Sequence, residues 1–321
     1  MNKTNKLSII VAALLVVSPV FAQNWPTRTV RIIVPYAAGG NTDYTARTVA
    51  AKVSEMWSQQ VVVDNRPGGG TNIGSELAAT AAPDGYTLFM GGASNAINMT
   101  LYAKPPYNTA RDFAPMVWCV QGAALLAAHP SLPAKNVKEL IALAKSKPGQ
   151  LNYGHAGLGS SNHMAGELLK FMTGINIVHV PYKGNSPSIT DAISGNVEMV
   201  FSGVPALVPH VQSKRLRAIA ISSLKRFPAV PDVPTFDESG VKGYEASNWF
   251  GLMAPIKVSK DIINKVNADV NKALAMKDVR DRFTRDGLIT KGGTIETFDK
   301  FIRAETAKYA NVIKKAGIEQ L

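Results

Sequence analysis

The segment that decides the fold is Tyr153-Gly154-His155-Ala156-Gly157-Leu158-Gly159-Ser160-Ser161-Asn162-His163. It predicts a glycine-rich turn between a short strand at residues 150–153 and a helix at residues 161–172, whose apolar side chains recur at helical spacing. The N-terminus of a helix exposes unpaired N–H groups and carries about half a positive charge. Glycines let the backbone approach an anion closely, and serines add hydroxyl donors. The segment therefore predicts a loop that binds a carboxylate or a phosphate.

A second segment repeats this design closer to the N-terminus. Residues 30–34 predict a buried strand, and Pro35-Tyr36-Ala37-Ala38-Gly39-Gly40-Asn41-Thr42-Asp43 leads from it into a helix at residues 44–56. Strand, glycine turn and helix occur throughout α/β proteins, so either segment alone is a weak indication of a ligand site. Together they predict two jaws around one anion.

The first 22 residues have the pattern of a secretory signal peptide. A polar start with two lysines precedes an apolar run at residues 7–21, and Val20-Phe21-Ala22 fits the small-residue rule for cleavage. The apolar run is too short for a membrane span, although an uncleaved N-terminal anchor is the alternative. We therefore expect an exported, soluble chain that begins at Gln23.

Length and composition favour two lobes and an anionic partner. The chain has 321 residues, of which 46% are hydrophobic, and a formal net charge of +12. A chain of this size usually divides its core, and a basic chain favours anionic partners. It contains no recognisable nucleic-acid module, so no nucleic-acid partner is expected. Cys119 is the single cysteine, so no intramolecular disulfide can form, and we expect it to pack in the core.

Strands and helices alternate through both halves of the chain, which predicts mostly parallel sheets covered on both faces. The apolar segments at residues 116–129 and 249–254 are candidates for crossings between lobes. The predicted architecture is α/β with two lobes and two interlobe crossings. Domain 1 is predicted from residues 23–122 and 247–321, and domain 2 from residues 123–246. A cleft between such lobes is a common place for a small molecule to bind.

Catalytic, metal and cofactor sites are not expected. A nucleophile elbow needs Gly-x-Ser-x-Gly, whereas no glycine follows Ser160 or Ser161, and His163 lies too close in sequence to act as a well-oriented base. The five histidines form no HxxxH pair. The glycine-rich loop at residues 66–74 lacks both the GxGxxG spacing and the lysine of a P-loop.

Further polar residues follow strands at the carboxyl ends, where ligands of α/β sheets bind. Ser94 and Asn95, in an expected polar turn through Asn98, follow a strand at residues 87–91; Tyr182 and Ser202 follow strands of the second half. Asp43 can either cap its helix or position a water or an ammonium group. The predicted ligand-binding residues are Tyr36, Ala38, Gly39, Gly40, Asp43, Ser94, Asn95, Ala156, Gly159, Ser160, Ser161, His163, Tyr182 and Ser202.

The chain resembles a known family, the periplasmic receptors of tripartite tricarboxylate transporters, also called Bug receptors. The resemblance covers nearly all of the chain after residue 22. It rests on the two glycine-rich segments quoted above and on Val63-Asp64-Asn65-Arg66-Pro67-Gly68-Gly69-Gly70, Pro181-Tyr182-Lys183-Gly184, Pro231-Asp232-Val233-Pro234-Thr235 and Trp249-Phe250-Gly251-Leu252-Met253-Ala254-Pro255.

The resemblance implies a type II periplasmic binding protein that closes like a flytrap on a small organic acid. It implies that residues 38–43 and 156–163 pinch a carboxylate through backbone groups and ordered waters. Tyr36 stands where the family often has Phe, and Ala37-Ala38 replace a more usual pair containing Pro, so these departures bear on the choice of ligand.

The function implied is a non-enzymatic one: a receptor binds a small organic carboxylate in the periplasm and delivers it to membrane permease subunits. The sequence leaves the oligomeric state open, and a monomer is the default for a protein that must close and dock. Two alternatives stay open at this point. One is a periplasmic esterase-like enzyme that processes carboxylates, and the other is a ligand-sensing receptor for a membrane kinase. The sequence leaves the identity of the carboxylate open.

Overall fold

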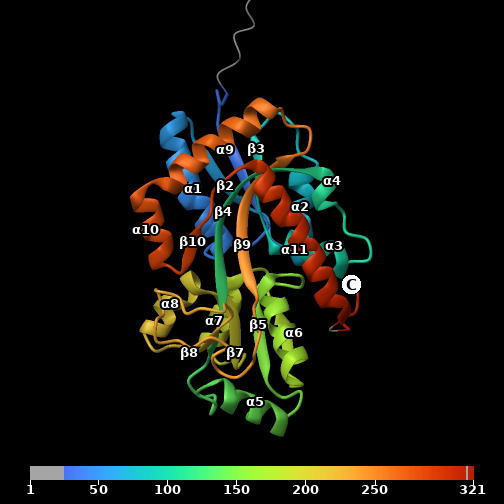
Figure 1. Ribbon diagram of the computed structural model, residues 1–321, viewed down its shortest axis with the longest axis vertical. Helices are drawn as coiled ribbons and strands as arrows, with labels where there is room; N and C mark the ends of the chain where they lie inside the picture. The colour runs from blue at the N-terminus through green and yellow to red at the C-terminus, as the bar shows by residue number, and fades with distance from the viewer. Residues whose placement is uncertain (1–24, 316) are drawn as a thin grey trace, which may run out of the picture.

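The computed structural model describes residues 25–315 and 317–321. The predicted signal peptide at residues 1–22 lies outside the described residues. Two lobes lie one above the other along the long axis, as Figure 1 shows, and they are joined where strand β4 (Phe113–Ala128) enters the second lobe and strand β9 (Ser247–Pro255) returns to the first. The predicted α/β architecture with two crossings is confirmed.

The first lobe is built from both ends of the chain. Strand β1 (Val30–Val34) pairs in parallel with β2 (Val61–Asn65) and β3 (Thr87–Gly92). Its branched side chains are almost fully buried, as the continuous apolar pattern predicts for a parallel strand covered on both faces. The other elements of this lobe are α1 (Asn41–Trp57), the 3-10 turn Gly69–Thr71, α2 (Asn72–Ala79), α3 (Ala93–Leu101), α4 (Thr109–Asp112), α9 (Lys260–Ala275), α10 (Lys277–Arg285), β10 (Leu288–Thr290) and α11 (Ile295–Lys315).

The second lobe repeats the parallel arrangement on a smaller scale. Strand β5 (Asn152–His155) lies between β6 (Val178–Pro181) and β7 (Met199–Gly203) and is parallel to both. The remaining elements of this lobe are α5 (Val137–Ser146), α6 (Ser161–Thr173), α7 (Asn185–Ile193), α8 (Val204–Gln212) and β8 (Arg217–Ile221).

The two lobes share one path of strands, in the order β2-β1-β3-β9-β4-β7-β5-β6. The strand pairs formed by β1 in the first lobe and by β5 in the second are parallel. The strand pairs formed by β4 or β9 are antiparallel. Strand β4 changes partners within two residues, because Ala123 pairs with Ser247 of β9 and Ala124 pairs with Gly203 of β7. This change of partner marks the hinge between the lobes. The predicted domain limits fall in this region and stay a prediction.

The segment after β3 differs from expectation. The polar turn predicted through Asn98 is helix α3. Two of its asparagines face inward and are hydrogen-bonded there: Asn95 Oδ1 accepts from the Gly92 N–H at 3.0 Å, and Asn98 Nδ2 donates to the Gly70 carbonyl at 2.9 Å. Polarity in this segment therefore reflects buried hydrogen bonding and not exposure to solvent.

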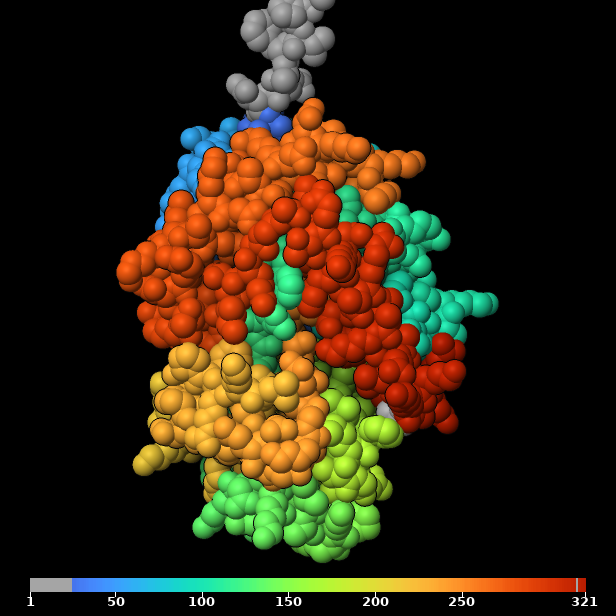
Figure 2. Space-filling model, in the orientation of Figure 1, coloured from blue at the N-terminus to red at the C-terminus, as the bar shows by residue number. Residues whose placement is uncertain are grey.

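Packing brings the lobes into contact along the waist. Met164 of α6 is buried in the same apolar cluster as Ile97 and Leu101 of α3, on the other lobe. Figure 2 shows the two lobes meeting at the waist, with residues of β4 visible between them. Cys119 is buried in the core of the first lobe, as predicted, and burial raises the pKa of its thiol to about 12. Among the described residues, no helix has both the length and the apolar character that crossing a bilayer requires.

Candidate functional site

Three helices begin around one small cavity between the lobes. The first turn of α1 contributes Gly40, Asn41 and Thr42 from the first lobe. The second lobe contributes the start of α6 and of α7. The cavity is lined by Tyr36, Gly40, Asn41, Thr42, Ala156, Ser160, Ser161, Asn162, Asn185, Asn248 and Phe250.

The electrostatics of this cavity favour an anion. Each helix start presents N–H groups without intrahelical partners and the positive end of a helix dipole. Within the described part of the chain, the lining contains no charged side chain. Positive potential therefore comes from backbone dipoles, which suit a carboxylate held without a fixed cation.

The lobes are closed over this cavity. The Ala37 N–H donates to the Lys183 carbonyl at 3.0 Å, and the Ser186 hydroxyl donates to the Ala38 carbonyl at 2.8 Å. On the inner side, the Ser161 hydroxyl donates to Oδ1 of Asn248 at 2.7 Å. The cavity leaves about 10 Å³ for the centre of a water molecule, enough for roughly one water. A larger ligand therefore requires the jaws to move apart.

Several buried polar atoms around the waist have no hydrogen-bond partner among the described residues. In the cavity lining these are Nδ2 and Oδ1 of Asn41 and Oδ1 of Asn162. The hydroxyls of Ser94 and Ser202, which are fully buried, share this property. Native proteins satisfy most buried polar groups, so such a concentration from both lobes indicates a place built for a polar ligand or for ordered water.

The predicted residues of the first jaw divide into two groups. Tyr36 and Gly40 line the cavity, and burial raises the pKa of the Tyr36 phenol, which keeps it a neutral donor. Ala38 and Gly39 lie on the exposed side of the loop. Asp43 is buried beside them: its carboxylate accepts from the Gly39 N–H at 2.9 Å and pairs with Arg47 at 3.0 Å. This geometry suits a carboxylate that shapes the loop, and a ligand role for Asp43 stays a prediction.

The predicted residues of the second jaw also divide into those that line the cavity and those that do not. Ala156, Ser160 and Ser161 all line the cavity. The Ser160 hydroxyl caps α6 by accepting from the His163 N–H at 3.1 Å. Gly159 adopts a left-handed conformation, with φ of 73°, and lies against the Asn98 side chain of the first lobe, where no Cβ would fit. His163 is not in the lining and instead contacts His155 and His179.

Four predicted residues lie at the edge of the site or away from it. Asn95 is engaged in the core, with Nδ2 donating to Ser75 and Tyr107 hydroxyls at 3.2 Å each. The Tyr182 hydroxyl donates to Asp191 at 2.7 Å in a neighbouring groove. Ser94 and Ser202 are buried with free hydroxyls but do not line the cavity.

Sequence reasoning missed several asparagines that the structure places in the lining. Asn41 and Asn162 stand in the first turns of the two anion-loop helices, so the capping pattern itself could have identified them. Asn185 and Asn248 are brought in by α7 and β9, and Phe250 closes one wall. The Asn162 amide donates to Oδ1 of Asn185 at 2.8 Å, which fixes both side chains.

In the described structure, neither Ser160 nor Ser161 forms a catalytic triad with His163. Ser160 accepts from a backbone N–H and Ser161 donates to Asn248, so neither hydroxyl is hydrogen-bonded to the His163 imidazole in the described structure. Burial lowers the pKa of His163 to about 4, and it lowers the pKa of His155 and His179 below the usual range as well.

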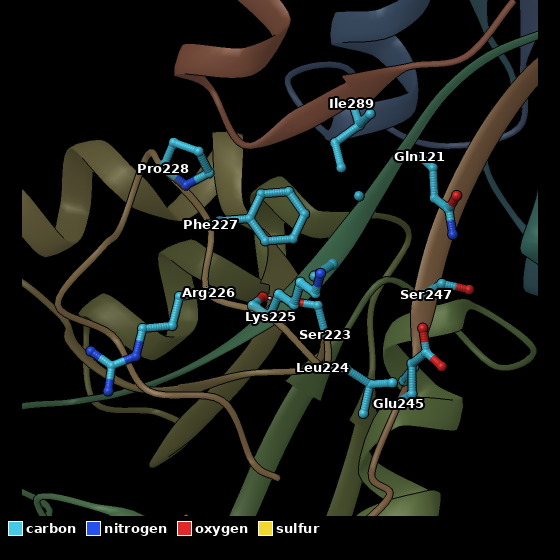
Figure 3. A pocket seen from close by; sticks show the side chains of 13 residues that line it. Gln121, Ser223, Leu224, Lys225, Arg226, Phe227, Pro228, Glu245, Ser247 and Ile289 are labelled. Atoms are coloured by element: carbon cyan, nitrogen blue, oxygen red, sulfur yellow. Dashed lines mark hydrogen bonds between the residues drawn. The ribbon is translucent and has the colours of Figure 1, made fainter. Parts of the chain in front are cut away.

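A larger groove lies at the hinge, apart from this cavity. Figure 3 shows Phe227 and Ile289 bordering it from the two lobes, with Gln121 and Ser247 marking the crossing strands. The groove is mainly apolar, and none of the predicted ligand-binding residues in the described chain lines it. The polar cavity between the helix starts is therefore the better candidate for an anion.

Comparison with known proteins agrees with this geometry. The profile of the "Tripartite tricarboxylate transporter family receptor" family matches residues 45–318. Protein BugT of Bordetella pertussis is 35% identical over 99% of both chains.

Solved structures show the same fold. The Rpa4515 protein of R. palustris, solved with adipate, has a TM-score of 0.90 and 36% identity over 92% of this chain and 100% of its own. MatC of Rhodopseudomonas palustris, solved with bound malate, has a TM-score of 0.87 and 31% identity over 90% of this chain and 100% of its own. These similarities confirm the predicted periplasmic binding protein fold.

Proposed function

We propose, since this chain belongs to the tripartite tricarboxylate transporter receptor family, that it captures a small organic acid between its lobes and delivers it to membrane permease subunits. The receptor role follows from the family. The ligand class, the permease partner and the role of each site residue are the proposal.

The observation that carries the proposal is the set of unpaired polar atoms where helix starts from both lobes converge. Asn41 approaches from the first lobe and Asn162 from the second, and both leave buried polar atoms without partners. An unsatisfied buried polar group costs about 1–3 kcal/mol, which a ligand that hydrogen-bonds to it removes. Groups from opposite lobes can reach the same ligand only in the closed state. Binding and closure are thereby coupled.

The ligand class follows from the charge of the cavity. Backbone N–H groups at helix starts favour a carboxylate, and asparagine and serine side chains recognise its oxygens. Relatives solved with adipate and malate support a dicarboxylate as the first choice. Even one carboxylate group is larger than the single water that the cavity accommodates, so we expect the jaws of the loaded form to lie slightly further apart than in this structure.

The mechanism is a population shift between two arrangements of the lobes. The open form admits the acid to one jaw, and the hinge at Ala123 and Ala124 allows the other jaw to close. The closed surface, which includes the contact of residues 37–38 with Lys183 and Ser186, then identifies the loaded receptor to a permease. The predicted signal peptide places these events in the periplasm. We propose no catalytic step.

The test is thermal unfolding of the mature protein, after unfolding and refolding to remove carried-over ligand, with adipate, malate and the neutral diamide of adipate. At 100 times its dissociation constant a ligand stabilises by about 2.7 kcal/mol, which corresponds to about 4 °C or more here. A saturable shift with a dicarboxylate but not the diamide is expected. Equal shifts with the diamide, or no shift with any of a broad panel of organic acids, would contradict the carboxylate proposal. Hydrolysis of a chromogenic ester that Ser161→Ala abolishes would contradict the absence of catalysis.

A further inference from the structure

We propose that His155, His163 and His179 form a binding site for a divalent transition-metal cation of the zinc class. The three residues come from different elements: the end of β5, the first turn of α6 and β6. None of them lines the cavity between the lobes. The proposal therefore concerns a second site, independent of the organic acid.

The positions of the ring nitrogens carry the proposal. One potential ligand atom from each histidine lies within 4.8 Å of the other two. His155 Nε2 and His179 Nδ1 are 3.3 Å apart. Two nitrogens bound tetrahedrally to zinc at about 2.0–2.1 Å are about 3.4 Å apart, so this pair already has the spacing of a coordinated pair. The third nitrogen has to approach each of the other two by at most about 1.4 Å to reach the same spacing.

The surroundings orient one of these rings. Nδ1 of His155 lies 3.0 Å from the Gly157 carbonyl and 3.2 Å from the Gly157 N–H, so it can donate to the first in one tautomer or accept from the second in the other. When Nδ1–H donates to that carbonyl, the lone pair of Nε2 faces His179, the arrangement that metal-binding histidines usually show. The bond from the Gly159 N–H to His163 Nδ1 is long, at 3.4 Å, and little is lost if coordination replaces it.

The cluster is accessible and has a countercharge. His163 and His179 line a hollow that also includes Glu167, Lys170 and the end of the chain near Glu319. Figure 1 shows this C-terminus beside α6. Glu167 lies one helical turn after His163, and its carboxylate is held by the Tyr153 hydroxyl at 2.9 Å and by Lys170 at 2.9 Å. It offers negative charge to a cation, while Lys170 offsets part of that charge.

The chemistry of the donors selects the class of metal. Three imidazoles without a thiolate suit Zn²⁺, Cu²⁺ or Ni²⁺ better than Ca²⁺ or Mg²⁺, which prefer oxygen ligands. Three protein ligands leave a fourth position for water or for a carboxylate. A cation held here joins both ends of the loop at residues 156–162 and so stiffens the second jaw.

The experiment uses the mature protein without an affinity tag, treated with a chelator and kept free of organic acids. Calorimetric titration with Zn²⁺ is expected to show one equivalent bound, and the melting temperature is expected to rise by several degrees. Titration with Co²⁺ is expected to give the intense visible bands of a four-coordinate site. His179→Gln and His163→Gln are each expected to weaken Zn²⁺ binding at least about tenfold, since even outer-sphere changes cost about 10–100-fold.

His129→Gln and His210→Gln are the matched controls, because these two histidines lie outside the cluster. Both are expected to bind Zn²⁺ as the parent does. His179 is only half-buried, so its variant is expected to keep the metal-free melting temperature of the parent. Absence of saturable binding, or equal losses in cluster and control variants, would overturn the proposal. Neither result bears on the binding of an organic acid, which is measured without metal.

Discussion

The side chain of Asn41, at the start of α1, lies so close to the backbone of Gly203, at the end of β7, that residue 203 has no room for a Cβ. The two residues belong to opposite lobes. Gly203 has ordinary extended angles, φ −70° and ψ 153°, so its own backbone does not require glycine. Position 203 requires glycine because the Asn41 side chain of the opposite jaw occupies the space of a Cβ, and it does so only when the lobes are closed.

Gly203→Ala is therefore expected to oppose closure without straining the second lobe. The added methyl group meets Asn41 when the jaws close, so affinity for the organic acid is expected to fall at least about tenfold, or about 1.4 kcal/mol. Calorimetry measures the affinity, and small-angle scattering is expected to show a larger radius of gyration without ligand. Unchanged affinity and radius would show that Asn41 simply moves aside.

Asn41→Ala is expected to reduce affinity by tenfold or more while leaving the unliganded protein as stable as before or slightly more stable, because neither polar atom of its side chain has a partner. Removing an unpaired buried polar group relieves its desolvation cost of about 1–3 kcal/mol. Asn95→Ala is the matched control, because Asn95 has hydrogen-bond partners inside the first lobe. It is expected to lower the melting temperature markedly. If Asn41→Ala loses stability as Asn95→Ala does, Asn41 is structural.

Substitutions of two adjacent serines, Ser160 and Ser161, are expected to affect different properties. The first is expected to change mainly the stability of the fold, and the second mainly the closure of the lobes. Ser160→Ala removes the cap of α6 and is expected to cost about 1 kcal/mol of unfolding free energy. Ser161→Ala removes the 2.7 Å bond to Asn248 across the lobes, so it is expected to weaken ligand binding with a smaller effect on unliganded stability. Denaturant unfolding and calorimetry on both variants test this difference. The opposite ranking would contradict the assignment.

Acid is expected to remove the stabilisation that Asp43 provides. Burial alone would raise the pKa of this carboxyl, but Arg47 and the Gly39 N–H outweigh it and the pKa lies below its usual 3.8. A lowered folded-state pKa contributes stability that is present above the unfolded value and is lost as the pH falls through the folded one. The advantage of the parent over Asp43→Asn, at most about 1 kcal/mol near pH 7, is expected to shrink as the pH falls below 3.8. Melting temperatures of both proteins across this range provide the check, and a difference that does not change with pH would contradict it.

The local structure of both jaws could be predicted because it is encoded in short segments. The apolar run at Val30–Val34 forms the predicted strand, and the helix predicted from Tyr44 begins slightly earlier, at Asn41. Ser160 caps α6, a role that was not predicted. The family resemblance and the two-lobed fold, both inferred from motifs, are confirmed. The predicted ligand contacts of Asp43, Asn95 and Tyr182 stay predictions, and the structure gives these side chains partners within the protein.

Sequence by itself determined the elements, the glycine turns and their order, because hydrophobic periodicity and capping depend on neighbours within a few residues. Only the tertiary structure decided which side chains share the cavity and which histidines form the cluster. Asn248 reaches Ser161 across 87 positions, and His155 meets His179 because β5 and β6 pair in parallel. Contacts between residues so far apart in the sequence depend on strand order, register and closure of the lobes, and a local sequence pattern contains none of these.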